Sequence, residues 1–300
     1  MKNKQTSSIL WLIFIMLVWG STYAVTKSVV HVLPPGCFAF VRFIIALLCL
    51  LPVYLSDRKA IAAQQFKKND YWWLFLMGIT GISGYYVFFN YSLMYTSASS
   101  GALIQGFIPV CIALSGILFL KEHLSGLQIT GICLSFIGVV LVGLIAAEDK
   151  GEKSSLIGNL LMIAAVLCWT TYTLISRKLN HLKPIIITFW SGCIGTALLF
   201  PLSVYEFSQF TQPVHISLNG WMALIYLGAI SSAFCYLMYN KALEKLPAAM
   251  VGNFLNLDIM IGVLIAILFL QEQLSIIQLA GGVFILSGLV LSSQKNNKLQ

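Results

Sequence analysis

The sequence predicts an all-α polytopic membrane protein with ten transmembrane helices, arranged as two inverted repeats of five helices. Three observations predict this class: an apolar composition, a match of the sequence to itself at a spacing of 150 residues, and an uneven distribution of Lys and Arg between loops. Hydrophobic residues make up 59% of the chain and charged residues 9%, and the mean hydropathy is +0.88. A soluble domain carries roughly 25% charged residues, so long parts of this chain are suited to a bilayer interior.

Ten apolar segments are long enough to form membrane helices, because a hydrocarbon core about 30 Å thick needs roughly 20 residues per helix. They lie near residues 9–30, 36–55, 72–94, 98–120, 126–146, 156–176, 185–205, 220–240, 247–270 and 276–293. Prolines or charged residues separate several of these segments, as is typical of loops. The first segment is too long for the core of a signal peptide and lacks its cleavage pattern, so we expect it to be retained.

The chain matches itself when it is shifted by 150 residues. Glu122-His123-Leu124-Ser125 aligns with Glu272-Gln273-Leu274-Ser275, and about half of the residues between 114 and 141 are identical to their partners. Further equivalent pairs are Trp19–Trp169, Lys27–Arg177, Pro34–Pro184, Gly78–Gly228, Tyr86–Tyr236 and Asn90–Asn240. Such self-similarity indicates structural repeats. We expect residues 1–150 and 151–300 to be two repeats that form one unit together.

Lys and Arg predict the orientation of the helices, because cytoplasmic loops are enriched in both. With a cytoplasmic N-terminus, the outer loops hold only Lys150 and Lys153, and Lys27 lies near an outer helix end. The inner segments then hold Lys2, Lys4, Arg58, Lys59, Lys67, Lys68, Lys121, Arg177, Lys178, Lys183, Lys241, Lys245, Lys295 and Lys298. Both termini are therefore predicted to be cytoplasmic. Because each repeat has an odd number of helices, the second repeat is inverted relative to the first, and such halves can rock about a central site.

Charge and motif content exclude other classes of protein. The net charge of +8 lies in short loops without a basic face interleaved with aromatic residues, so we expect no nucleic-acid partner. The seven cysteines lie in apolar segments without Cys-x-x-Cys or a nearby His, so we expect core packing and neither a metal site nor a cofactor. The four histidines fall in loops or at helix ends, and nucleotide-binding and hydrolase motifs are absent. An intramembrane enzyme is thus only a remote alternative, and we expect no direct coupling to ATP within this chain.

Several motifs carry a family pattern. In the first repeat they are Trp19-Gly20-Ser21 through Lys27, Arg42-Phe43, Ser97-Ala98 through Pro109, and Phe119-Leu120-Lys121-Glu122-His123-Leu124. Their counterparts are Trp169 through Arg177 and Phe269-Leu270-Gln271-Glu272-Gln273-Leu274. Over nearly the whole chain this pattern resembles the EamA-type members of the drug/metabolite transporter superfamily. The resemblance implies a metabolite carrier, commonly an exporter of amino acids or related compounds. The family often keeps a proline in both repeats, whereas Ile259 stands here opposite Pro109.

Asp258 is the only acidic residue well inside an apolar segment. A charged group at membrane depth costs roughly 2.5–3.5 kcal/mol on insertion scales, and desolvation favours the neutral form of a carboxyl group. Two interpretations stay open: Asp258 is a proton-coupling carboxylate, or it is a structural partner of Arg42, Asn253 or Asn256. Asn253 and Asn256 make the ninth segment the most polar of the central helices, and we expect both to line the cavity.

Aromatic and amide side chains at equivalent positions of the two repeats are candidates for lining a cavity. Tyr86 and Asn90 share a helix face, as do Tyr236 and Asn240, because residues four apart lie one above the other. The alternative for both asparagines is a hydrogen bond that joins neighbouring helices. Gln105 lies at a depth that suits a lining role. Trp19 and Trp169 lie at equivalent depths and either contact the solute or pack in the core.

The remaining candidates are structural or gating residues. Arg42 lies roughly two turns into the second segment and needs a carbonyl, a carboxylate or water, so we expect a structural role. Glu122 and Glu272 end helices at equivalent positions, which indicates a structural or gating hydrogen bond. Lys27 and Arg177 lie near helix ends, where long basic side chains can extend to the lipid headgroups. Small residues permit close helix contact, and we expect the following to pack the two halves together, with a dimer contact as the alternative: Gly131, Ser135 and Gly138, and Gly281, Gly282 and Gly288.

These patterns predict a secondary transporter in the cytoplasmic membrane that exports small organic metabolites, such as amino acids, by alternating access. Proton antiport depends on Asp258. The alternatives are an uncoupled facilitator and an importer of a metabolite or drug. The expected partners are the solute, protons and the lipid bilayer, and the protein is expected to be a monomer or a homodimer.

Overall fold

The computed structural model describes residues 2–30, 32–120, 126–142, 156–211, 216–246 and 248–292. Within these residues the secondary structure is helical, and no strand occurs. Six helical segments are long and apolar enough to cross a membrane: Leu10–Val29, Pro35–Ser56, Lys68–Tyr95, Leu156–Lys178, Pro184–Gln209 and Leu218–Lys245. Shorter apolar helices cover Ala98–Ile112, Ile129–Val140, Phe254–Leu270 and Ile276–Gly288. The all-helical membrane class predicted above is confirmed at this level.

The helices of the first half follow the predicted segments closely. They are α1 (Lys2–Val29), α2 (Pro35–Ser56), the short α3 (Arg58–Ala62), α4 (Lys68–Met77), the π-helix η1 (Gly78–Gly84), α5 (Tyr85–Tyr95), α6 (Ala98–Gln105), α7 (Ile108–Leu120) and α8 (Gly126–Val140). Their ends follow local sequence signals. Pro35 begins α2, where its missing N–H costs nothing, and the Ser97 hydroxyl accepts the Ser100 N–H at the start of α6.

The second half repeats this order. Its helices are α9 (Leu156–Lys178), α10 (Pro184–Gln209), α11 (Leu218–Ile225), the π-helix η3 (Tyr226–Phe234), α12 (Cys235–Lys245), α13 (Ala248–Leu270) and α14 (Ile276–Ser292). Pro184 begins α10 as Pro35 begins α2, and Ser217 caps α11. The π-helices η1 and η3 occupy equivalent places, each in the middle of a 28-residue segment. A wide π turn is rare and often marks a functional site.

One pair of equivalent segments differs between the halves. The segment 98–120 is interrupted after Gln105, and α7 begins at Ile108, whereas α13 is continuous over 23 residues. The cause is Pro109, which cannot donate a backbone hydrogen bond inside a helix and is tolerated in a first turn. The amide groups of Gly106 and Phe107 bond to carbonyl groups three residues back, which tightens the end of α6. Ile259 imposes no such break on α13.

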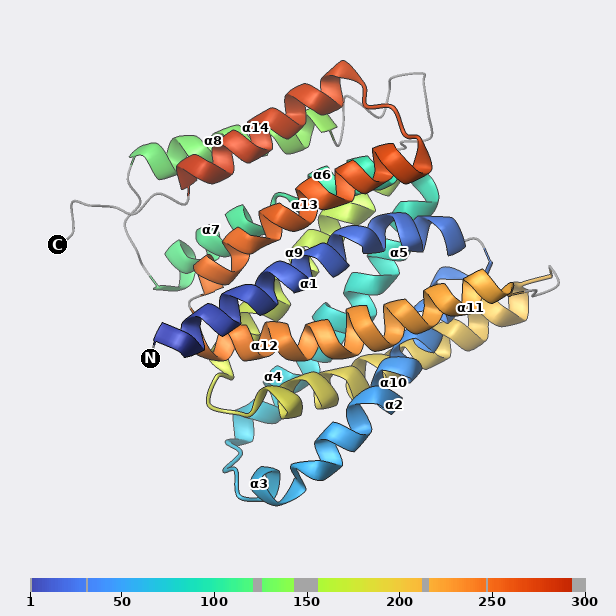
Figure 1. Ribbon diagram of the computed structural model, residues 1–300, viewed down its shortest axis with the longest axis vertical. Helices are drawn as coiled ribbons and strands as arrows, with labels where there is room; N and C mark the ends of the chain where they lie inside the picture. Colours follow the sequence, from blue (N-terminus) through green and yellow to red (C-terminus); the bar gives the residue numbers. More distant parts are fainter. Residues whose placement is uncertain are drawn as a thin grey trace.

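Repeat-equivalent helices lie next to each other across the molecule. The pair α8–α14 forms one outer edge, and the pair α2–α10 lies toward the other edge (Figure 1). Between these pairs lie α1, α5, α9, α12 and α13, with α6 beside α13 (Figure 1). Among them, α1 contacts α5 and α12, and α9 contacts the same two helices, so these four form a central layer of the molecule. Helices from both halves contribute to that layer.

Glycines bring α8 and α14 into close contact. A Cβ atom added to Gly138 would lie 2.5 Å from the carbonyl oxygen of Gly281 and 2.8 Å from the amide nitrogen of Ile285. The Ser135 hydroxyl donates to the Ile285 carbonyl group at 3.1 Å. The small residues of these helices therefore pack the two halves together, as predicted.

Two basic side chains bind helix ends. Lys27 Nζ donates to the carbonyl groups of Leu93 and Thr96, the latter at 2.6 Å. Its equivalent Arg177 donates from Nη1 to the Leu243 carbonyl group at 2.7 Å. Each therefore satisfies carbonyl groups at the C-terminus of a neighbouring helix, a role that replaces the expected extension to the lipid headgroups.

We expect Gly138→Ala to lower stability by about 1–3 kcal/mol, because the new methyl group meets backbone atoms of α14 that cannot rotate away. Thermal unfolding of purified protein in detergent measures this change. Gly126→Ala on the same helix is the matched control, since a Cβ atom there has no neighbour within 4 Å. Equal melting temperatures for the two variants would contradict the predicted close contact of α8 and α14.

Candidate functional site

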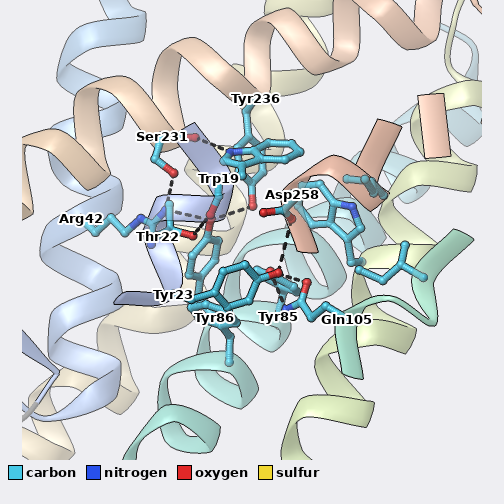
Figure 2. Close-up of a pocket in the computed structure, with 14 residues that line it drawn as sticks. Trp19, Thr22, Tyr23, Arg42, Tyr85, Tyr86, Gln105, Ser231, Tyr236 and Asp258 are labelled. Carbon is cyan, nitrogen blue, oxygen red and sulfur yellow. Dashed lines mark hydrogen bonds between the residues drawn. The ribbon is translucent and has the colours of Figure 1, made fainter. Parts of the chain in front are cut away.

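A pocket lies in the central layer where helices of both halves meet (Figure 2). Its walls are mainly aromatic, with a few polar groups. They consist of Trp19, Thr22 and Tyr23 from α1, Arg42 from α2, Tyr85, Tyr86 and Phe89 from α5, Gln105 from α6, Ile108 from α7, Trp169 from α9, Ser231 from η3, Tyr236 from α12, and Leu255 and Asp258 from α13. Apolar walls with a few convergent polar groups are typical of small-molecule sites.

The pocket is nearly closed in this structure. Its volume is about 20 Å³, whereas a single water molecule needs about 10–15 Å³ on the same measure. An organic solute therefore fits only after the surrounding side chains move apart. The structure thus shows a compact arrangement of the central layer.

Residues 150 apart in the sequence contact each other in this pocket. The rings of Trp19 and Trp169 meet edge to face with centroids 5.2 Å apart and an angle of 89°. The rings of their neighbours Tyr86 and Tyr236 lie 6.5 Å apart, and the Tyr236 hydroxyl bonds to that of Tyr86 at 3.2 Å. All four predicted aromatic residues therefore lie together at the contact between the repeats.

The π-helices η1 and η3 present backbone carbonyl groups to this aromatic cluster. Trp19 Nε1 donates to the carbonyl oxygen of Ser231 in η3 at 3.0 Å. The Tyr236 hydroxyl donates to the carbonyl oxygen of Gly81 in η1 at 3.1 Å. Gly81 and Ser231 are themselves 150 residues apart. Each π turn thus fixes one aromatic ring of the pocket.

Asp258 is 6% exposed and lies against the pocket. The Tyr23 hydroxyl donates to Oδ2 at 3.3 Å, while Oδ1 is buried without a hydrogen-bond partner. The ion pairs of the described side chains join His181 to Asp70 and Lys183 to Asp57. The carboxylate of Asp258 therefore lies more than 4.0 Å from the basic nitrogen atoms of Arg42. Asp258 therefore has one weak contact and one free oxygen.

Arg42 joins helices of the two halves and also lines the pocket. It donates hydrogen bonds to Ser232 Oγ at 2.8 Å, to Ser231 Oγ at 3.0 Å and to the Tyr86 hydroxyl at 3.1 Å. These bonds tie α2 of the first half to η3 of the second. The side chain also reaches toward the centre of the pocket (Figure 2).

Gln105 lines the pocket from α6. Its amide nitrogen donates to the Tyr85 hydroxyl at 3.0 Å. This bond fixes the Tyr85 ring against Trp169, with ring centroids 5.1 Å apart.

Other predicted residues lie away from the pocket and join helices. Asn90 donates to the Pro35 carbonyl group at 3.1 Å. Asn240 donates to the hydroxyl groups of Tyr172 and Thr188, each at 2.8 Å. These contacts correspond to the helix-joining alternative for both asparagines. Asn256 is partly buried on α13 but does not belong to the pocket walls.

Glu272 binds the N-terminus of α6. Its carboxylate accepts hydrogen bonds from the Ala98 and Ser99 amide groups, each at 2.9 Å, and from the Ser99 hydroxyl at 2.7 Å. A carboxylate is favourable at this end of a helix. Pro109 lies at the start of α7, one residue past Ile108 of the pocket wall. Glu122 and the side chain of Asn253 lie outside the described part of the chain.

Sequence reasoning did not find several pocket residues, in particular Thr22, Tyr23, Tyr85 and Ser231. Thr22 and Tyr23 follow Trp19 by one helical turn, so a search for neighbours of that tryptophan on one helix face would have found them. Ser231 carries no such signal, because its position depends on the π turn.

The comparisons with known proteins agree with this architecture. The sequence profile of the EamA-like transporter family matches residues 6–144 and again residues 156–294. The chain belongs to the EamA-like transporter family. It is therefore a membrane transporter of the drug/metabolite transporter superfamily.

Relatives of this EamA-like transporter align over nearly their full length. It is 27% identical over 291 residues to the uncharacterized transporter YyaM of Bacillus subtilis, covering 94% of this chain and 93% of that protein. It is 28% identical over 297 residues to an uncharacterized transporter of Clostridium kluyveri, covering 95% and 94%. A solved crystal structure with 19% identity superposes with a TM-score of 0.67 over 95% of this chain and 96% of that chain, which shows a shared fold.

We expect Glu272→Ala to lower the stability of this EamA-like transporter by about 1–3 kcal/mol, because three donors at the start of α6 lose their acceptor. Thermal unfolding in detergent measures the change. Glu244→Ala is the control, since the Glu244 side chain is exposed on α12. A melting temperature of Glu272→Ala equal to that of the control would show that the helix end does not depend on this carboxylate.

Proposed function

We propose that this EamA-like transporter is a secondary transporter that carries small organic metabolites through the central pocket by alternating access. The observation that carries the proposal is the contact of repeat-equivalent residues, Trp19 with Trp169 and Tyr86 with Tyr236, in the walls of one pocket. A site on the contact between two similar halves can be exposed to either side when the halves rock. Aromatic rings, an amide and two charged side chains suit polar organic solutes such as amino acids.

The proposed topology has ten membrane spans in two inverted repeats, residues 1–150 and 151–300, with both termini cytoplasmic. The double match of the family profile supports the two repeats, and the contacts of α2 with α10 and of α8 with α14 support a pseudo-two-fold arrangement. The distribution of Lys and Arg supports the orientation. The bacterial and archaeal relatives support the cytoplasmic membrane as the location.

We expect a fluorescent protein fused to either terminus to be fluorescent, and an alkaline phosphatase fused to the C-terminus to be inactive, because phosphatase folds only after export. Measurement of both reporters in intact bacterial cells tests the orientation. The matched control carries the phosphatase after Glu152, in the predicted outer loop between the repeats, where it should be active. Phosphatase activity at the C-terminus would contradict the proposed topology.

The transport unit is proposed to be the single chain. The glycines of α8 and α14 face each other between the halves, so this surface is used within one molecule. A homodimer would need a different surface.

Asp258 is the proposed proton-coupling group. It is the acidic side chain among the pocket walls, and its Oδ1 atom has no hydrogen-bond partner. A carboxyl group that is out of water and free of a fixed cation can exchange a proton as its surroundings change. Export follows from the family resemblance, and proton antiport would supply the energy.

We expect Asp258→Asn to abolish the dependence of transport on the pH gradient, because Asn cannot bind or release a proton. Proteoliposomes loaded with a mixture of cytosolic metabolites, analysed by mass spectrometry with and without a pH gradient, provide the measurement. Asp57→Asn is the matched control, since Asp57 forms a partly exposed ion pair with Lys183 at 2.7 Å and such pairs contribute about 0–1 kcal/mol.

Three outcomes have different meanings for this proposal. Unchanged pH dependence in Asp258→Asn would remove the proton-coupling role of this residue. Transport by the wild-type protein that does not depend on the pH gradient would indicate a facilitator. Accumulation driven by the gradient in the direction opposite to export would indicate an importer.

A further inference from the structure

Arg42 is a buried cation whose charge has no fixed counter-ion. Its side chain is 1% exposed, and a guanidinium group stays protonated in proteins. The ion pairs recorded for the described residues join His181 to Asp70 and Lys183 to Asp57, and none involves Arg42. Such a charge is costly to bury unless a partner neutralises it.

Neutral groups hold the guanidinium in place and leave one edge open. Nε and Nη2 donate to Ser232, Ser231 and Tyr86 at 2.8–3.1 Å, and the guanidinium carbon lies 4.4 Å from the centroid of the Tyr86 ring. Nη1 is buried and has no hydrogen-bond partner. The group is therefore oriented by one edge and one face, while two N–H donors on Nη1 remain unused.

The unused donors belong to a residue of the pocket wall (Figure 2). A buried donor without an acceptor costs free energy, and the cost is higher when the group is charged. A planar guanidinium matches a carboxylate, which accepts charge-assisted hydrogen bonds from it. The pocket thus presents a fixed cation whose remaining donors suit an anionic group.

Asp258 is the competing partner for this charge. It belongs to the same pocket, but it does not form an ion pair with Arg42, and its nearest hydrogen bond is to Tyr23. Its position on α13 and that of Arg42 on α2 place the two charges on different helices around one space. An entering anionic group can therefore approach Nη1 without first breaking a direct Arg–Asp bond.

We propose that Arg42 Nη1 is the subsite for a carboxylate group of the transported solute. This inference rests on the proposed function, in which the central pocket binds the solute. Ser231 and Ser232 position the guanidinium, and the aromatic walls contact the rest of the solute. The pocket selects solutes with an anionic group, because a neutral analogue leaves the Nη1 donors without an acceptor.

The test uses the full chain in proteoliposomes and probes that share one skeleton. Phenylalanine is loaded inside, and mass spectrometry follows its release relative to protein-free vesicles. The other probes, 3-phenylpropionate, 3-phenylpropanol and 3-phenylpropylamine, are added as competitors, because the alcohol and the neutral form of the amine cross a bilayer unaided. We expect 3-phenylpropionate to slow the release of phenylalanine, and the alcohol and the amine to leave it unchanged. Arg42→Gln should slow this release by about tenfold or more, given the loss of a hydrogen bond to a charged group.

Two variants keep the test decisive if Arg42→Gln is unstable. Arg42→Lys keeps the positive charge but lacks the planar donor pair, so we expect release slower than in the wild type and faster than in Arg42→Gln. Arg58→Gln, at an exposed position of α3, should release phenylalanine as the wild type does. Gel filtration and thermal unfolding in detergent establish that each variant is folded, and the comparison of probes in the wild type needs no variant.

The outcomes separate this inference from the function on which it rests. Competition by the alcohol or the amine equal to that by 3-phenylpropionate, with the release of phenylalanine unchanged in Arg42→Gln, would overturn the carboxylate subsite while supporting transport. Retention of phenylalanine and of every member of a wider mixture of cytosolic metabolites would overturn the proposed transport of small metabolites, and the subsite with it.

Discussion

The central layer of the protein depends on how a buried arginine is satisfied inside an apolar helix bundle. Arg42 bonds to three hydroxyl groups, two of which come from η3 of the other half. A bilayer interior offers no water to these groups, so the hydrogen bonds of this side chain come from other helices of the protein. The contact between the halves is therefore specified by hydrogen bonds as well as by packing, and the aromatic walls of the pocket form around it.

The π-helices explain how the second half reaches this arginine. A wide turn in the middle of a long helix shifts the following residues and leaves carbonyl groups for other donors. In η1 and η3 the carbonyl groups at equivalent positions, Gly81 and Ser231, accept hydrogen bonds from Tyr236 and Trp19. The same device occurs in both halves, but only η3 adds the serine hydroxyl groups that hold Arg42. The backbone contacts of the π-helices are thus repeated in both halves, whereas the serine hydroxyl groups that bind Arg42 occur in η3 and not in η1.

The outer parts of the molecule show the same combination of repetition and difference. Lys27 and Arg177 bind equivalent helix ends in the two halves, whereas Pro109 interrupts one helix and Ile259 leaves its counterpart continuous. A continuous α13 gives Asp258 a rigid support, while the break before α7 lies beside Ile108 of the pocket wall. Movement between the halves is therefore expected to be absorbed more easily near α7 than near α13, because a helix break lacks some of the backbone hydrogen bonds that resist bending.

Much of the architecture could be read from the residues in order, since apolar length, proline positions and the 150-residue match are local or periodic properties. They predicted the helices and the family. Of the eight predicted cavity residues whose side chains the structure describes, five line the pocket: Trp19, Tyr86, Gln105, Trp169 and Tyr236. Only the tertiary structure decided the roles of the polar residues. Asn90 and Asn240 share helix faces with Tyr86 and Tyr236 but lie one turn further along, where neighbouring helices and not the pocket provide their partners. The tertiary structure also shows that Arg42 and Asp258 line the same pocket without forming an ion pair. The sequence could not show this, because the partners of a side chain depend on helix crossing angles and π turns that no local sequence pattern records.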